Sequence, residues 1–191
     1  MVVKLGIPQI RYEVESLTRM LLGETPVTIV LPEETAPAEK DIITVTEEPT
    51  EDGVMCCVRA FFDGRMQKCT RRCTDDPVEK EQTVCRLIYD QLTALLGHSL
   101  PWGMLTGVRP VKLVRQMTEA GLAEAEIARK LIDYGVSKER LQLSLDTWRN
   151  QKAIIERLTP DKVSLYVAIP FCPSRCSYCS FVSHSIERAG N

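Results

Sequence analysis

Apolar residues recur with strand and helix periods through the first hundred residues. Residues 2–5 and 27–31 are apolar runs of strand length, and a helical pattern lies between them. One face of that helix would carry Ile10, Val14, Leu17 and Leu21. Residues 32–37 contain two prolines and suit a surface loop, and the strand pattern resumes at residue 41. We therefore expect a strand, helix, strand opening.

A hairpin and a long helix are predicted next. Asp63-Gly64 separates two strand-like segments, 53–62 and 65–74, and this dipeptide readily takes the positive φ angles of a two-residue turn. Asp76 then provides an N-cap before Pro77, and apolar residues follow at helical spacing up to Gly97. This helix is expected to cover the sheet.

Three more helices are predicted between residues 98 and 160, with no strand signal. The first begins at Pro110 and stops at Gly121, the second ends near Gly135, and Ser137 caps a longer third. Pro160 breaks that helix. A new strand is then expected over 163–169, with one face formed by Val163, Leu165, Val167 and Ile169.

These elements predict a mixed α/β chain in three parts. Residues 1–97 would form an α+β domain, residues 98–160 a helical segment packed on it, and residues 161–191 the start of a further domain. The 191 residues are 44% hydrophobic and 26% charged, which is typical of a globular protein.

The net charge and the hydropathy of the chain limit the classes of partner that the protein is expected to bind. The formal net charge is −2, without the basic excess typical of nucleic-acid binding, so no nucleic-acid partner is expected. No apolar run approaches the roughly 20 residues of a membrane span, and the first residues lack the order of a signal peptide. We expect a cytoplasmic protein with no membrane partner.

Three of the eight cysteines carry the candidate chemistry. In the reducing cytosol most cysteines stay as thiols, which favours metal or redox roles. Cys172, Cys176 and Cys179 fall within eight residues beyond the last predicted strand. Three thiolates at this spacing can hold one cuboidal iron-sulfur cluster and leave its fourth iron open. A structural zinc site remains an alternative, and His184 would be its nearest additional ligand.

The surrounding residues resemble a known family. The segment YVAIPFCPSRCSYCSF, residues 166–181, resembles the CxxxCxxC signature of radical S-adenosylmethionine enzymes. Tyr166 and the lead-in 169–171 resemble the branch that contains oxygen-independent coproporphyrinogen III oxidases. The segment LTGVRP, residues 105–110, resembles HemZ-type coproporphyrinogen dehydrogenases, which carry a long N-terminal region before the radical domain.

The resemblance implies a cofactor site. Cys172, Cys176 and Cys179 would ligate a [4Fe-4S] cluster whose open iron chelates S-adenosyl-L-methionine, and Tyr166 and Tyr178 match positions that contact this cofactor. An electron from a reductant such as flavodoxin or ferredoxin would then yield a 5'-deoxyadenosyl radical.

The resemblance also implies a reaction and a fold. The reaction would be the oxygen-independent decarboxylation of coproporphyrinogen III propionates to vinyl groups, giving protoporphyrinogen IX in haem biosynthesis. The strand over 163–169 would be the first of a partial TIM-type barrel that is truncated here, so the chain is expected to be an N-terminal fragment that is inactive alone.

Two departures from the family pattern support an alternative. Ala168 stands where the coproporphyrinogen oxidases have histidine, and Phe181 stands where they have a further cysteine. Relatives with the phenylalanine include proteins that bind or traffic haem without oxidising coproporphyrinogen. A third hypothesis makes residues 1–160 a binding module for a partner protein or a tRNA-like ligand, and the net charge gives the latter little support.

The remaining candidates have structural interpretations. Cys69 and Cys73 are expected to pack as small hydrophobes rather than ligate a second cluster. The neighbours Cys56 and Cys57 should point to opposite faces of a strand, and Cys85 should lie on the apolar side of a helix. Other polar candidates are Arg109, which at a helix start suits either a carboxylate ligand or an ion pair, and His98, for which solvation is expected.

Overall fold

The computed structural model describes two compact units. It describes residues 1–105, 108–159, 161–163, 165–174, 176, 179, 184 and 185. The first unit is Met1–Gln151 and the second is Lys152–Asn191. The three-part division at residues 97 and 160 remains a prediction.

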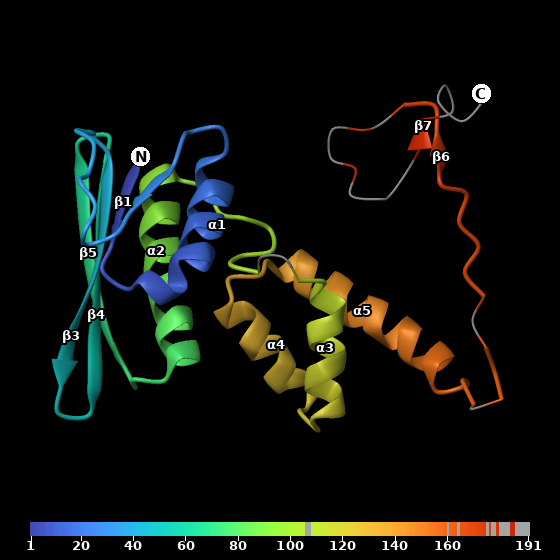
Figure 1. Ribbon diagram of the computed structural model, residues 1–191. Helices are drawn as coiled ribbons and strands as arrows, with labels where there is room; N and C mark the ends of the chain where they lie inside the picture. The colour runs from blue at the N-terminus through green and yellow to red at the C-terminus, as the bar shows by residue number, and fades with distance from the viewer. Residues whose placement is uncertain are drawn as a thin grey trace. The chain divides into compact units, whose positions relative to one another are not determined.

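A five-stranded mixed sheet forms the centre of the first unit. Its order is β2-β1-β3-β4-β5; β1 pairs in parallel with both β2 and β3, and β4 pairs antiparallel with β3 and β5 (Figure 1). The strands are β1 Val2–Leu5, β2 Thr28–Val30, β3 Ile42–Thr50, β4 Gly53–Phe62 and β5 Arg65–Cys73. The mixed α/β class predicted from the sequence is thus confirmed.

The β4–β5 hairpin forms at the predicted dipeptide. Asp63 has a φ of 48° and Gly64 a φ of 73°, the left-handed values that a two-residue turn of this kind requires. β5 ends the sheet, so one side of its backbone has no strand beside it in the described part of the chain. Four basic residues lie along this edge strand, namely Arg65, Lys68, Arg71 and Arg72.

Two helices cover one face of the sheet. α1 (Arg11–Leu22) follows a 3₁₀ turn at Pro8–Ile10, and α2 (Pro77–Leu96) lies beside it on the same face (Figure 1). The four apolar residues predicted on one face of α1 are all buried. Along β4, Cys56 and Val58 are buried whereas Arg59 is exposed, so alternate side chains face the helices.

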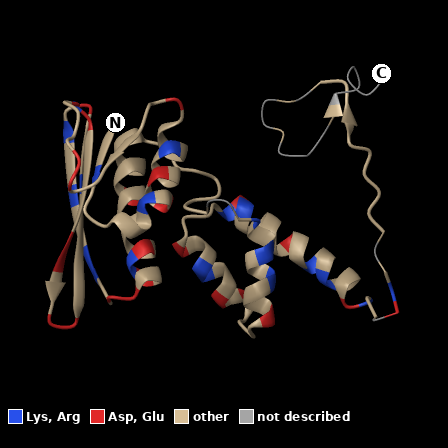
Figure 2. Ribbon diagram, viewed as in Figure 1, with Lys and Arg blue, Asp and Glu red and all other residues tan. Residues whose placement is uncertain are grey.

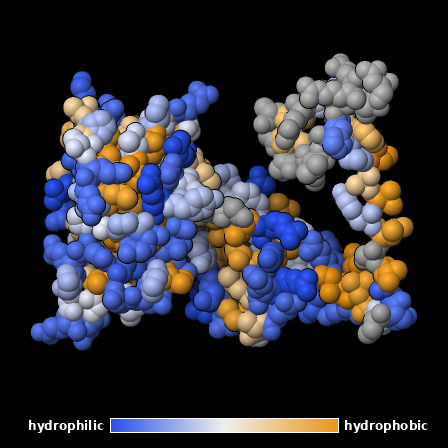
Figure 3. All heavy atoms as spheres, in the orientation of Figure 1, coloured by the Kyte–Doolittle hydropathy of each residue, from blue (hydrophilic) through white to orange (hydrophobic). Residues whose placement is uncertain are grey.

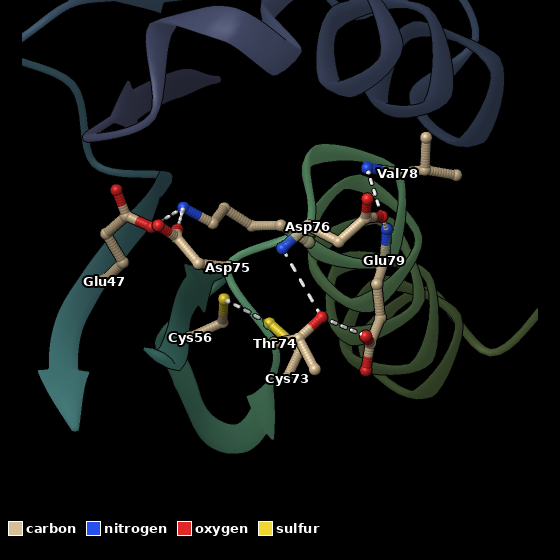
Figure 4. Close-up of polar contacts among 9 residues, drawn as sticks. Glu47, Cys56, Cys73, Thr74, Asp75, Asp76, Val78 and Glu79 are labelled. Carbon is tan, nitrogen blue, oxygen red and sulfur yellow. Dashed lines mark hydrogen bonds and ion pairs between the residues drawn. The ribbon is translucent and has the colours of Figure 1, made fainter. Parts of the chain in front are cut away.

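The ends of α2 follow the predicted capping. The Asp76 carboxylate accepts hydrogen bonds from the backbone N–H of Val78 at 3.0 Å and of Glu79 at 2.9 Å (Figure 4). These bonds satisfy amides that would otherwise have no partner in the first turn. At the other end, the C-cap is Gly97 in the left-handed conformation.

A lysine joins the start of α2 to the sheet. The Lys80 ammonium lies 2.7 Å from the Asp75 carboxylate and 2.8 Å from that of Glu47 on β3. Hydrogen bonds to Asp75 and then Glu47 raise the pKa of Lys80, so the ammonium stays charged. Figure 4 shows both carboxylates turned toward this one nitrogen.

The predicted helices between residues 98 and 160 are confirmed. They are α3 Pro110–Glu119, α4 Glu124–Asp133 and α5 Lys138–Ile155, and the described residues between 98 and 159 contain no strand. None of the helices in the described part of the chain combines the length and the apolar composition needed to cross a bilayer.

Residues 100–104 and 134–135 attach this helical segment to α2. The Gln82 amide donates to the Tyr134 hydroxyl at 3.0 Å, and the Met104 N–H donates to the Tyr134 carbonyl at 2.8 Å. A Cβ at Gly103 would lie 2.1 Å from that same carbonyl oxygen. Only glycine therefore allows the two backbones to approach this closely.

The strand predicted over 163–169 is wrong. The described residues between 163 and 170 have no regular secondary structure, and Val163 is 93% and Leu165 88% exposed. A strand needs a neighbour that satisfies its backbone groups, and the described residues provide none for this segment. The alternating apolar side chains therefore remain exposed, as the orange spheres along this segment show (Figure 3).

We expect Asp76→Ala to lower the free energy of unfolding by about 1 kcal/mol, because two amides of α2 lose their acceptor. Urea unfolding followed by circular dichroism would measure this loss. Asp76→Ser keeps a capping oxygen and should retain most of the stability. Equal losses in both variants would show that the cap does not contribute through this acceptor.

We expect the paired substitution Val163→Ser and Val167→Ser to reduce the fluorescence of the dye ANS, because exposed apolar surface is removed. The urea midpoint of the first unit should stay unchanged, since neither side chain is buried. Val78→Ser, which removes a single exposed apolar side chain on α2, is the control and should change ANS fluorescence little. A lower midpoint in the paired variant would instead mean that the segment packs on the first unit.

Candidate metal centre

The cysteine segment begins at a short strand pair in the second unit. β6 (Phe171–Cys172) pairs in parallel with β7 (His184–Ser185), and the His184 N–H donates to the Pro170 carbonyl at 2.7 Å. The rings of Phe171 and His184 pack with their centroids 6.1 Å apart. The pairing places Phe171 opposite His184 and Cys172 opposite Ser185, positions 13 residues apart along the chain.

A backbone hydrogen bond joins the second and third cysteines. The Cys179 N–H donates to the Cys176 carbonyl at 3.0 Å. Cys176 is exposed, and Cys172 and Cys179 are half-buried. None of the three forms a disulfide.

The donor chemistry of these residues fits an iron-sulfur cluster, although the thiols are not gathered. Among the described residues, no three His, Cys, Asp or Glu side chains lie close enough together to hold a metal ion. Thiolate ligands commonly converge only when the metal binds, because metal binding is coupled to local folding. Ligation by Cys172, Cys176 and Cys179 therefore remains a prediction, and so does the zinc alternative with His184.

The two predicted cofactor contacts also stay predictions. Tyr166 is 84% exposed in the extended segment before β6. Tyr178 lies outside the described residues.

Two polar candidates, Arg109 and His98, belong to the first unit. Arg109 is exposed at the N-cap of α3, and no ion pair to it is found in the described part of the chain. The His98 ring lies 3.2 Å from the Leu21 carbonyl, so a backbone group as well as solvent contacts it.

Most of the other cysteines have the structural roles predicted for them. Cys56 is fully buried and its neighbour Cys57 half-buried, as expected for opposite faces of β4. Burial raises the pKa of both Cys56 and Cys85 to about 12, so each remains a neutral thiol and a poor metal ligand near neutral pH. The Cys73 sulfur packs 3.6 Å from that of Cys56.

The prediction for Cys69 is wrong. Its side chain is exposed rather than packed, although it lies opposite the buried Val58, because β5 is the last strand of the sheet. Cys69 is therefore an exposed cysteine that is not one of the three candidate ligands.

Sequence reasoning missed the β6–β7 pair. Two-residue strands are too short to show a periodic pattern, and their pairing joins positions on either side of the cysteines. The rings of Phe171 and His184 pack together at this pair. Only the fold brings them together, so the sequence held no signal for it.

Comparison with known proteins finds one informative relative. The chain is 29% identical over 155 residues to the oxygen-independent coproporphyrinogen-III oxidase-like protein HemZ of Bacillus subtilis (strain 168), a match that covers 76% of this chain and 31% of the relative. The chain thus spans about a third of the length of that protein. No family model matches the chain. No solved structure matches it either.

We expect iodoacetamide at pH 8 to alkylate Cys69 and Cys176 before Cys56 and Cys85. The thiolate is the reactive form, and burial raises the pKa of the latter two to about 12. Peptide mass spectrometry after a short reaction would measure the modified fraction at each site. In urea all four should react alike, and early modification of Cys56 in the folded chain would contradict its burial.

Proposed function

We propose that Cys172, Cys176 and Cys179 bind a [4Fe-4S] cluster and that the protein acts in haem biosynthesis as an oxygen-independent coproporphyrinogen III oxidase. The observation that carries this proposal is the three-cysteine loop. Its flanking residues resemble radical S-adenosylmethionine enzymes, and the chain is similar to a HemZ protein. Neither the motif nor the similarity to the relative depends on where the three thiols lie in the structure. Both therefore support the proposal from the sequence.

Each part of the loop has a role in this proposal. A backbone hydrogen bond holds Cys176 and Cys179 close together, and the β6–β7 pair fixes the backbone at the third ligand, Cys172. When bound, the cluster supplies an electron to the sulfonium of S-adenosyl-L-methionine. Tyr166 and Tyr178 would contact that cofactor and orient its adenosyl group.

The substrate and the reductant belong to the same proposal. Each reacting propionate of coproporphyrinogen III would lose carbon dioxide, two electrons and a proton to give a vinyl group of protoporphyrinogen IX, and S-adenosyl-L-methionine would take up those electrons and that proton as it is cleaved to methionine and 5'-deoxyadenosine. Flavodoxin or ferredoxin would deliver the electron. Because the chain spans 31% of its relative, these functions are proposed for the whole protein.

A haem-binding or haem-trafficking function is the second candidate. Ala168 and Phe181 occupy positions where the coproporphyrinogen oxidases carry histidine and cysteine. Loss of these two side chains would remove potential contacts near the cluster without affecting the three ligands. The two functions therefore share a cluster and differ in what binds beside it.

We expect anaerobic reconstitution with iron and sulfide to give an absorbance shoulder at about 400 nm and to load about four irons per chain. Alanine at Cys172, Cys176 or Cys179 should remove most of both signals. Cys69→Ala, which changes another exposed cysteine, is the matched control and should leave them intact. Loss of the cluster in the control but not in Cys172→Ala would contradict the ligand assignment.

The same reconstituted chain separates the two functions. In the oxidase proposal, S-adenosyl-L-methionine should change the electron paramagnetic resonance spectrum of the reduced cluster, because the cofactor binds its open iron. In the trafficking alternative, added haem should show a shifted Soret band that saturates at one haem per chain. A cluster that responds to haem alone would overturn the oxidase proposal.

A further inference from the structure

Two buried cysteines of the first unit lie side by side, apart from the cysteine loop. Cys56 of β4 and Cys73, the last residue of β5, place their sulfurs 3.6 Å apart, and Figure 4 shows the two turned toward each other. Both are free thiols, 0% exposed at Cys56 and 4% at Cys73. A disulfide bond is about 2.05 Å long, so the sulfurs, now 3.6 Å apart, need to approach by about 1.5 Å to form one.

The fold selects this contact between two equivalent positions in the hairpin register. Arg71 lies directly opposite Cys56. Cys69 and Cys73 are therefore offset from Cys56 by two residues each, in opposite directions along β5. The right-handed twist of neighbouring strands brings one diagonal neighbour closer than the other. Cys73 is the one that packs on Cys56, whereas Cys69 is exposed.

Cys73 ends its strand beside an open pocket. The pocket has a volume of about 600 Å³, and its lining includes Val54, which lies opposite Cys73, and Asp75, two residues further along the chain. The end of a strand opens locally more readily than its centre. Local opening there would expose the Cys73 thiol to a small molecule in the pocket before it exposed Cys56, which lies further inside the sheet.

Acidic and basic side chains lie together where β5 ends and α2 begins (Figure 2). Lys80 contacts the carboxylates of Glu47 and Asp75, and all three side chains line the pocket. Arg72 lies 3.9 Å from Asp52. The carboxylates at this opening repel an anionic oxidant, whereas a small neutral hydroperoxide is not repelled.

We infer that Cys56 and Cys73 form a disulfide when the protein meets a hydroperoxide. With hydrogen peroxide, the Cys73 thiolate attacks one oxygen, the O–O bond breaks, and the leaving hydroxide takes up a proton to give water. Cys73 is then a sulfenic acid. The Cys56 sulfur attacks the Cys73 sulfur, and the hydroxyl leaves with the Cys56 proton as a second water. The two thiols lose two electrons in total, and the peroxide gains them.

The environment of Cys56 suits the second step. Burial, followed by the hydrogen bond with Cys73, raises the pKa of Cys56 to about 12, so this thiol keeps its proton. Its S–H can donate to the Cys73 sulfur and stabilise the negative charge there as Cys73 attacks. Neither thiol belongs to the cysteine loop, so the inference does not depend on the iron-sulfur proposal.

Disulfide mapping of the folded chain tests the inference. The chain is treated with hydrogen peroxide, its remaining thiols are alkylated in urea without a reductant, and linked tryptic peptides are identified by mass spectrometry. We expect a linked pair made of residues 41–59 and 73–80, which contain Cys56 and Cys73. Dithiothreitol should separate the pair. Free thiols at both positions after the exposed Cys69 is fully oxidised would overturn the inference.

Two neighbouring cysteines provide matched controls. Cys57→Ser changes the residue next to Cys56 on the opposite face of β4, and Cys69→Ser changes the exposed cysteine of β5. Both variants should keep the link, whereas Cys56→Ser and Cys73→Ser should each lose it. A link to residues 69–71 in place of 73–80, or an equal yield from the chain in urea, would contradict a contact set by the fold.

The bond should also stabilise the hairpin. It would close a loop over residues 57–72, which reduces the conformational freedom of the unfolded chain. We expect peroxide to raise the urea midpoint of the first unit relative to Cys73→Ser treated alike, and dithiothreitol to remove the difference. A midpoint that does not rise would overturn the claim that the bond fits the native hairpin. Cys172→Ala should form the link normally, so failure of the cluster proposal and failure of this one are distinguishable.

Discussion

The burial of α2 on two sides is the constraint on which the first unit depends. One side of the helix packs on β4 and β5, and Val84, Ile88 and Leu92 are fully buried. A second side of the helix packs against the backbone at Tyr134 and Gly135, where a Cβ on Gly135 would approach the Tyr89 ring to 2.9 Å. An α-helix with apolar residues on more than one face is stable only when both faces are covered. The sheet and the helical segment are therefore joined through one element.

The elements that the sequence predicted well are those with local causes. The turn at Asp63-Gly64, the cap at Asp76 and the start of α2 at Pro77 each depend on a few neighbouring residues, and each appears where expected. Apolar periodicity likewise placed the buried face of α1, because that face has one core to pack against. Local chemistry and tertiary packing agree at these positions.

The features that were missed depend on non-local pairing. The alternation over 163–169 is a strand pattern, yet without a neighbouring strand among the described residues it remains extended and exposed. Cys69 and Cys73 have equivalent patterns in sequence and each lies opposite a buried valine of β4, but only Cys73 is buried, with its sulfur against that of Cys56. Likewise, nothing local distinguishes Arg71 from Arg72; the register of β5 against β4 places Arg71 opposite the buried Cys56 and Arg72 opposite Met55. The candidate ligands, by contrast, follow from motif and resemblance.

The basic edge strand bears on how copies of this protein behave when they are crowded. An unpaired strand edge is a template for adding another chain, and β5 is nine residues long. If two copies approached edge to edge through β5, the four basic side chains of each strand would be brought near those of the other. That repulsion disfavours growth of the sheet at this end. At the opposite edge β2 has only three residues, too few to hold a partner strand firmly. The sheet thus has both ends protected against polymerisation, one by charge and the other by length.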